Sequence, residues 1–321
     1  MTRRIAAFAF LTMAAAAPAG AQAPQAEAIQ LGEGAQALHG TLLTPAVANR
    51  GAPILILPGS GPTDRDGNNP MGVRAAPYRM LAEALATEGI TSLRIDKRGV
   101  AASAAAGTAE ADLRLETFAN DARAWAARLR ERTGAPCVWL LGHSEGGLHA
   151  LLAAREPAGI CGLVLVSAPG RKFGDLLREQ LNPILAGTPL LDQATSILAE
   201  LEAGRQVPGA SVPPQLMSLF RPSVQPFMIS MLGVDPQELL RRFEGRVLVV
   251  HGSTDIQVSA ADAHRLHGAR PGIDFAQIEG MNHVMKIAPA ERQANGATYA
   301  DPDLPLAPGL ASRIAAFIRG R

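Results

Sequence analysis

Six short apolar runs, separated by segments of helical pattern, are the feature that most restricts the fold of this 321-residue chain. The runs lie at 52–59, 91–99, 137–144, 161–170, 246–255 and 273–280. The helical segments lie at 77–88, 115–132, 146–155 and 260–267, mostly with proline at the start or glycine after the end. Apolar strands that alternate with helices form a parallel sheet covered on both faces. The sequence therefore predicts an α/β fold, and segments near 26–30 and 37–43 could add two leading antiparallel strands.

Residues 171–245 interrupt this alternation with amphipathic helical stretches and no good strand. Their last helix has a clear start signal, with Asp235 as N-cap and Pro236 at the first helical position. Ligands of open α/β sheets bind beyond the carboxyl ends of the strands. We therefore expect a core of residues 22–170 and 246–321 with a helical cap, 171–245, that acts as a lid. The alternative is a helical decoration that touches no substrate.

The N-terminus resembles a secretory signal peptide. Arg3 and Arg4 precede an apolar stretch at 5–17, and small residues follow as far as Ala21. The apolar stretch is shorter than the roughly 20 residues that a membrane span needs, which disfavours a membrane anchor. We expect residues 1–21 to be removed and the mature chain to be periplasmic or secreted, with no membrane span. The formal charge of +1 and the absence of long charged runs give no sign of nucleic-acid binding.

Residues 142–146, with the sequence GHSEG, match the pattern G-x-S-x-G between an expected strand and an expected helix. A tight turn there would force Ser144 into a strained backbone conformation and expose its hydroxyl. The flanking glycines remove side chains that would collide in such a turn. Ser144 is thus the candidate nucleophile, and the alternative is a serine N-cap in an ordinary turn.

A serine nucleophile needs a base that is itself oriented by an acid. His283 follows the last expected strand. The other six histidines fit less well, because they lie beside Ser144, in expected helices, at a strand end or early in the chain. Asp255 lies just beyond a core strand, which gives the chain order Ser, Asp, His. Asp262 on the following helix and Asp274 at the start of a strand are weaker candidates for the acid.

Two backbone N–H groups are needed to stabilise an oxyanion. One would come from Glu145, directly after Ser144, and the other from the loop after the first parallel strand. Ser60 is the preferred residue there, with Gly61 second, because glycines 59 and 61 let the backbone approach a ligand. No metal-ligand spacing, phosphate loop or dinucleotide motif occurs, so no cofactor is expected.

Three segments together carry a family resemblance: PGSGPTDRDGN at 58–68, RIDKRGV at 94–100 and GHSEGG at 142–147. The chain resembles the α/β-hydrolase superfamily, and more narrowly its bacterial esterase and serine aminopeptidase-like (S33-type) branch with a helical cap. This resemblance implies a mostly parallel central sheet flanked by helices, with the cap inserted. The sequence departs from that branch at Pro58, where histidine is often found.

The resemblance also implies roles for individual residues. Ser144, Asp255 and His283 match the nucleophile, acid and base of the family. Residues 64–66 would brace the oxyanion loop, and residues 96–99 would form a packed turn near the site.

A disulfide is a further implication of the resemblance. It places the strands that begin at Cys137 and Cys161 next to each other and parallel. Neighbouring strands lie about 4.8 Å apart, within the Cα separation that a disulfide accepts. We therefore expect a Cys137–Cys161 bond at the edge away from the chemistry, and two buried free thiols are the alternative.

Together these features predict a serine hydrolase that cleaves carboxylic esters through an acyl-enzyme. Apolar residues of the cap favour a small ester with an apolar acyl group. A serine aminopeptidase-like peptidase would instead need a carboxylate in the cap for a free amine, and the candidates are Asp175, Asp192, Glu200 and Glu202. A thioesterase and a non-catalytic binding protein are the remaining alternatives.

Overall fold

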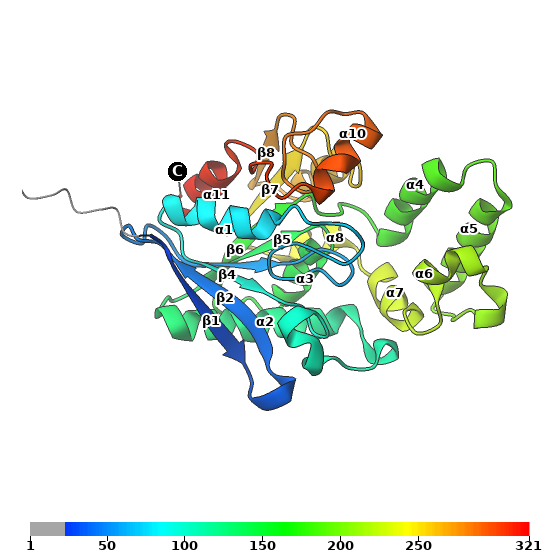
Figure 1. Ribbon diagram of the computed structural model, residues 1–321, viewed down its shortest axis with the longest axis horizontal. Coiled ribbons are helices and arrows are strands. Elements are labelled where there is room, and N and C mark those ends of the chain that lie inside the picture. Colours follow the sequence, from blue (N-terminus) through cyan, green and yellow to red (C-terminus); the bar gives the residue numbers. More distant parts are fainter. Residues whose placement is uncertain (1–22, 321) are drawn as a thin grey trace, which may run out of the picture.

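The computed structural model describes residues 23–320, which form an eight-stranded sheet with helices on both faces and a separate group of helices beyond one end (Figure 1). The strand order is β1-β2-β4-β3-β5-β6-β7-β8. The expected signal peptide, 1–21, lies outside the described residues.

Strands β3 to β8 correspond to the six apolar runs of the sequence, and β1 and β2 correspond to the two leading segments. Their bounds are β1 Gln25–Leu31, β2 Leu38–Thr44, β3 Ile54–Leu57, β4 Ser92–Ile95, β5 Val138–His143, β6 Ile160–Val166, β7 Arg246–Gly252 and β8 Ile273–Ile278. β1 and β2 are antiparallel to their neighbours, as expected for leading strands, and the pairs from β4 to β8 are parallel. Every residue of β3, β4 and β5 is buried, because helices cover both faces of these strands.

Two groups of helices complete the core. The helices are α1 Pro77–Thr87, α2 Leu115–Thr133, α3 Gly146–Ala153, α9 Ala260–His267, α10 Arg292–Ala297 and α11 Leu310–Ile318. Apolar side chains of α2, α3 and α9 pack on one face of the sheet, and those of α1 and α11 pack on the other. Figure 1 shows α1 and α11 on the opposite side of the sheet from α2 and α3. The fold class predicted from the alternation is confirmed.

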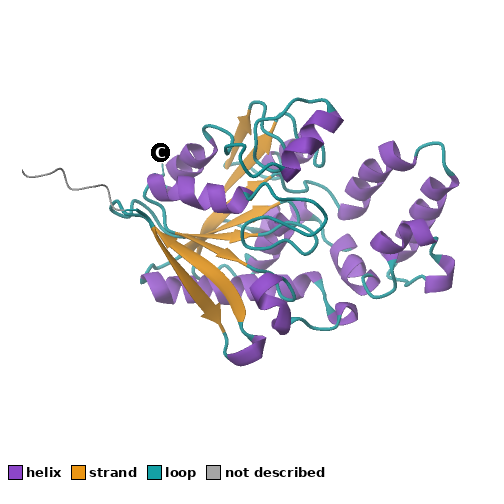
Figure 2. Cartoon of the chain, in the orientation of Figure 1, coloured by secondary structure: helices purple, strands orange, loops and turns teal. Residues whose placement is uncertain are grey.

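Between β6 and β7 the chain forms the helices that the sequence places in the cap. They are α4 Phe173–Leu185, α5 Pro189–Glu202, α6 Met217–Phe220, α7 Gln225–Leu232 and α8 Pro236–Arg242, with short 3₁₀ turns between α5 and α6. The side chain of Asp235 accepts hydrogen bonds from the first free N–H groups of α8, which explains where that helix begins. Figure 2 shows most of these helices standing beyond the end of the sheet.

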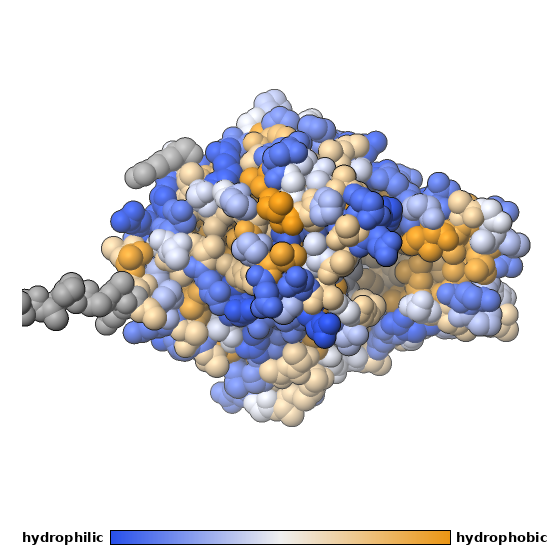
Figure 3. All heavy atoms as spheres, turned by 45° about the horizontal axis from the view of Figure 1, so that its top comes forward, coloured by the Kyte–Doolittle hydropathy of each residue, from blue (hydrophilic) through white to orange (hydrophobic). Residues whose placement is uncertain are grey.

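The cap has an apolar core of its own. Its buried residues come from α4, α5, α6, α7 and the 3₁₀ turns, and they are Leu177, Ala194, Ile197, Leu198, Leu201, Val212, Leu216, Phe220, Met228 and Leu232. Apolar side chains also reach the outer surface of the cap (Figure 3), and Ile184 in α4 is 69% exposed. The cap therefore coheres through its own packing as well as through its contacts with the sheet.

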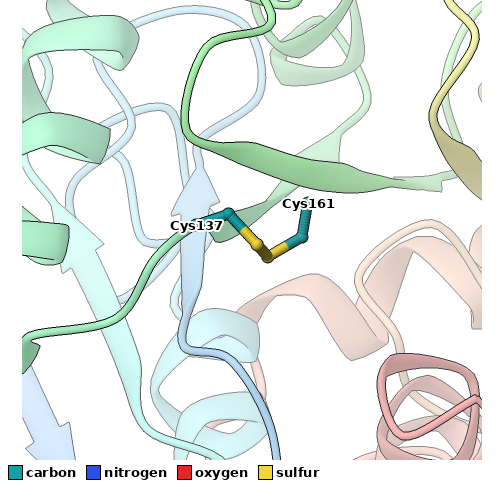
Figure 4. The surroundings of a disulfide bond; sticks show 2 residues. All are labelled: Cys137 and Cys161. Atoms are coloured by element: carbon teal, nitrogen blue, oxygen red, sulfur yellow. A yellow bond between two sulfur atoms is a disulfide. The ribbon is translucent and has the colours of Figure 1, made fainter.

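A disulfide joins Cys137, directly before β5, to Cys161 in β6 (Figure 4). The two Cα atoms are 5.1 Å apart, as neighbouring parallel strands allow. The bond lies at the amino end of β5, and Ser144 follows the carboxyl end of the same strand. The expected pairing is present, and it is separated from the chemistry by the length of a strand.

Candidate active site

Ser144 occupies a sharp turn between β5 and α3. Its φ is 54°, in the left-handed region that a side chain makes unfavourable. A Cβ at Gly142 would lie 2.3 Å from the carbonyl oxygen of Gly146, and a Cβ at Gly146 would lie 2.3 Å from that of Leu57. Glycine is needed at both positions because backbone approaches too closely for any side chain.

His283 and Asp255 form a buried pair. Nδ1 of His283 lies 2.8 Å from Oδ2 of Asp255, whose Oδ1 also accepts the backbone N–H groups of Gln257 and Val258. Burial raises the pKa of the Asp255 carboxyl, but the charge and hydrogen bonds around it prevail and lower the pKa to about 2. The carboxylate is ionised at neutral pH and keeps the proton of the imidazole on Nδ1.

Ser144 and His283 line one cavity of about 220 Å³, together with Ser60 and Tyr78. The structure thus brings the sequence-predicted serine, histidine and aspartate together at the carboxyl edge of the sheet. Among residues 23–320 the hydroxyl of Ser144 forms no hydrogen bond with His283. Contacts of this kind often shorten only when substrate binds.

The loop after β3 lies against the serine. A Cβ at Gly59 would be 3.3 Å from Cβ of Ser144. The N–H of Gly59 donates to Oη of Tyr78 at 2.9 Å, whereas those of Ser60 and Glu145 donate to no other group in the described part of the chain. Ser60 lines the cavity with Ser144, whereas Gly61 lines a different cavity. This placement favours Ser60 over Gly61 as the second N–H donor.

Tyr78 and His143 connect this loop to the histidine loop, and sequence reasoning missed the connection. Oη of Tyr78 lies 2.7 Å from Nδ1 of His143, and Nε2 of His143 lies 2.8 Å from the carbonyl oxygen of His283. A carbonyl only accepts, so Nε2 carries the proton and Tyr78 donates to Nδ1. Burial lowers the pKa of His143 to about 3, which keeps the ring neutral.

Lys97 and Glu145 form a second buried contact. The sequence places Lys97 only in a packed turn and does not link it to Glu145. Nζ of Lys97 donates to the carbonyl oxygen of Gly59 at 2.6 Å and lies 3.7 Å from Oε1 of Glu145. His149 lies 3.5 Å from the same carboxylate. Burial lowers the pKa of His149 to about 4, so its ring is neutral at pH 7. Burial also lowers the pKa of Lys97, and the negative charge of Glu145 opposes that shift.

Residues 64–66 bond within their own loop and to β4 and the residue after it, which fits the bracing role that the resemblance implies. Arg65 forms a salt bridge of 2.5 Å with Asp96 and donates its backbone N–H to the same carboxylate. Asp66 pairs with Arg94, and Asp64 accepts two backbone N–H groups of the loop. These bonds fix the path of the chain into the oxyanion loop.

Solved structures of low sequence identity share this fold. An esterase of Pyrococcus furiosus superposes with a TM-score of 0.57 at 16% identity, over 92% of this chain and 91% of the other. The esterase domain of a Rhodothermus marinus protein gives 0.54 at 19% identity, over 92% of this chain and 99% of the other. Est1E of Butyrivibrio proteoclasticus gives 0.54 at 16% identity, over 85% and 96%.

The chain has the α/β-hydrolase fold. Residues 71–202 also match the sequence model of a family described as serine aminopeptidase, S33. That match includes Ser144 and the first two cap helices, and it ends before Asp255 and His283. No curated protein sequence matches the chain.

The protein has a second cavity, of about 330 Å³, lined in part by Gly61 and Pro62 of the loop after β3. Gly61 and Glu145 line it, and Phe118 of α2 and Phe227 of α7 add apolar side chains to its lining. The cavity therefore lies between core and cap and reaches Glu145, the residue after Ser144.

Polar contacts tie the cap to the core at this second cavity. Nε of Arg221 lies 2.8 Å from the carboxylate of Glu110, to which Ser223 also donates. A further bond joins the backbone N–H of Leu115 to Oγ of Ser230 at 2.8 Å. These contacts hold α7 against the start of α2.

The cap contributes fewer side chains to the two cavities than its apolar composition suggests. Among its apolar residues Leu216, Phe220 and Met228 are buried inside the cap, whereas Phe227 lines the cavity of about 330 Å³. The carboxylates that could receive a free amine lie elsewhere. Asp175 and Glu202 pair with Arg178, Glu200 pairs with Arg205, and neither these three nor Asp192 lines either cavity in the described part of the chain.

Within residues 23–320 no helix is both long and apolar enough to cross a membrane. In the same range no three side chains of histidine, cysteine, aspartate or glutamate gather as ligands for a metal ion.

Proposed function

We propose that the protein is a serine esterase that cleaves carboxylic esters through an acyl-enzyme. The observation that carries this proposal is the shared cavity of Ser144 and His283, with Asp255 bonded to the far side of the imidazole. A serine in a strained turn, a base and an oriented acid are the parts that acyl transfer by this route requires.

In the proposed reaction, Nε2 of His283 takes the proton of Ser144 while Oγ attacks the ester carbonyl carbon. Asp255 holds Nδ1–H and remains ionised throughout. The N–H groups of Ser60 and Glu145 stabilise the oxyanion of the tetrahedral intermediate. His283 then protonates the leaving alkoxide, and a water molecule repeats the sequence on the acyl-enzyme to release the acid.

The proposed substrate is a small ester with an apolar acyl group. The cavity of about 330 Å³ supports this choice because Phe118, Val224 and Phe227 line it together with Glu145, the residue after Ser144. One solved structure of Est1E contains ferulic acid, so methyl ferulate belongs in the substrate panel beside p-nitrophenyl esters of increasing acyl length.

The proposed site of action is the periplasm or the exterior of the cell. The signal peptide expected at 1–21 and the disulfide between Cys137 and Cys161 support it, because disulfides persist in oxidising compartments. Mass measurement of the secreted or periplasmic chain would test it, with a mature N-terminus at Gln22 as the expected result.

Replacement of the nucleophile tests the function directly. Ser144→Ala is expected to fold and to lose both p-nitrophenyl ester hydrolysis and labelling by a fluorophosphonate. Ser167→Ala is the matched control, since Ser167 also follows a buried strand with a left-handed φ of 49° but lies outside the proposed machinery. Wild-type turnover in Ser144→Ala would refute the proposal.

A peptidase acting on short peptides is the second candidate, favoured by the description of the family matched by residues 71–202. It would use the same Ser144, His283 and Asp255. Faster cleavage of aminoacyl anilides than of matched esters would establish it. A thioesterase would be distinguished by acyl thioesters in the same panel, and a binding protein without activity would leave Ser144 unlabelled.

A further inference from the structure

The backbone of Gly59 is held through both its N–H and its C=O by side chains linked to the neighbours of Ser144. The N–H of Gly59 donates to Tyr78, which bonds to His143. The carbonyl of Gly59 accepts from Lys97, which pairs with Glu145. The residues before and after the nucleophile therefore each reach the oxyanion loop through one buried side chain.

Lys97 bonds to the peptide unit that contains the N–H of Ser60, the proposed oxyanion donor. The C=O of Gly59 and the N–H of Ser60 belong to one planar peptide unit, and no described peptide bond is cis. The N–H of Ser60 consequently points away from the carbonyl that Lys97 holds at 2.6 Å. Fixing the carbonyl fixes the direction of the N–H on the opposite edge of the same plane.

Lys97 also reaches the second proposed donor. Its Nζ lies 3.7 Å from the carboxylate of Glu145, whose own backbone N–H follows Ser144. The side chains of Lys97 and Glu145 are 6% and 5% exposed, so water screens their attraction little. The ring of Phe118 covers Nζ at 5.6 Å. One buried cation thus connects both halves of the proposed oxyanion site.

We propose that Lys97 is a positioning residue that orients and polarises the Ser60 N–H and fixes its spacing from the Glu145 N–H. The proposal rests on the proposed function. A cation that bonds to a carbonyl draws electron density from the peptide unit, and hydrogen bonds in a chain strengthen one another. The Ser60 N–H then becomes a stronger donor toward the developing oxyanion, while the neutral ester in the ground state gains less.

If Lys97 has this role, its removal should weaken stabilisation of the transition state and leave substrate binding unchanged. Removal of one complete oxyanion donor costs about 10²–10³ in kcat. Lys97→Met leaves the Ser60 N–H present but unpolarised and loosely oriented, so we expect kcat to fall by about 10- to 100-fold with KM within about twofold. Lys97→Arg retains the charge and donors and should recover most of the lost kcat.

The experiment compares Lys97→Met and Lys97→Arg with Lys286→Met, the control for removing another buried lysine that bonds to a backbone carbonyl. Rates are expressed per Ser144 labelled by a fluorophosphonate, so a partly unfolded preparation still gives a value. An alkylboronic acid reports affinity for a tetrahedral adduct, and the carboxylic acid product reports ordinary binding.

The expected result has three parts. In Lys97→Met the boronic acid affinity falls with kcat, the product affinity stays within about twofold, and Lys286→Met shows neither change. If Lys97→Met does not fold, Lys97→Gln, which keeps a neutral donor, is expected to lose about 3- to 10-fold in kcat with the same pattern.

Two results would overturn the inference while the esterase assignment stands. One is kcat within about twofold of wild type in folded Lys97→Met or Lys97→Gln, and the other is a loss that appears in KM or equally in Lys286→Met. A wild-type protein that hydrolyses no ester and leaves Ser144 unlabelled would overturn both proposals.

Discussion

Replacing Gly146 by alanine should separate the nucleophile from the oxyanion loop. A Cβ at this position would lie 2.3 Å from the carbonyl oxygen of Leu57 and 2.7 Å from that of Pro58. Both neighbours are backbone atoms at the end of β3, so neither can rotate away. The first turn of α3, with Ser144 directly before it, has to move instead.

The structure sets the size of the effect. Contacts of a Cβ closer than 3.0 Å essentially never occur, so α3 has to retreat from Leu57 by at least the difference between 2.3 and 3.0 Å. Overpacking of this kind costs about 1–3 kcal/mol, or a decrease in Tm of about 2–10 °C for a chain of this size. A misplacement approaching 1 Å at reacting groups costs about 10² in rate.

Gly296→Ala is the matched control, because Gly296 also lies in a helix, α10, and a Cβ there meets nothing within 4 Å. It should leave Tm unchanged or slightly raised, since alanine is the better helix former. Thermal unfolding and kcat/KM with p-nitrophenyl acetate would be measured for both variants. Equal Tm and equal kcat/KM in Gly146→Ala and Gly296→Ala would refute the reasoning.

Three further predictions concern the disulfide, a buried histidine and the acid. Alanine at both Cys137 and Cys161 should lower the free energy of unfolding by about 3 kcal/mol, because 24 residues separate the two half-cystines; kcat should be unchanged, and equal urea midpoints for the two forms would contradict this. The pKa of His149 is lowered by burial from 6.5 to about 4, so below pH 6.5 the unfolded chain binds a proton that the folded protein excludes. The free energy of unfolding therefore has its full value above pH 6.5 and should be lower by about 2 kcal/mol at pH 5. His149→Phe should reduce the difference in Tm between pH 7 and pH 5, and an undiminished difference would count against the assignment. Asp255→Asn should lower kcat by about 10⁴ while the fold persists, and more than a tenth of wild-type kcat would exclude the proposed role of that carboxylate.

The sequence predicts the sheet and the elbow because their signals are local. The apolar runs of β3 to β8 and the glycines at 142 and 146 can each be interpreted within a few residues of chain. The disulfide needed one further step, the strand order implied by the family resemblance. Once β5 and β6 are neighbours, Cys137 and Cys161 meet at the same edge.

The contacts around the oxyanion loop could not be predicted in this way. Lys97 bonds to a carbonyl 38 residues earlier, and Tyr78 meets a histidine 65 residues later. From the sequence alone, Lys97 in DKRG would be expected to be an exposed lysine in a turn, and no neighbour of Tyr78 indicates that its hydroxyl is buried. Such contacts exist only after β3, β4 and β5 have been brought side by side.

The cap shows the same limit. Its helices can be predicted from the spacing of their apolar residues, but that spacing does not show which apolar side chains pack inside the cap and which line the cavity of about 330 Å³. Phe220 and Phe227 are alike in sequence, yet Phe220 is buried in the cap core and Phe227 lines the cavity.

The cap leaves the sheet after β6 and returns before β7, and these two strands are hydrogen-bonded neighbours. Because the cap packs around its own apolar core, its sequence can diverge during evolution without changing the register of any strand. Contacts such as that of Arg221 with Glu110, and the apolar packing of Leu240 and Phe243 on the core, have to be preserved for a new cap to dock. Substrate choice can therefore drift, or be engineered by grafting, independently of the strands and loops that carry the chemistry.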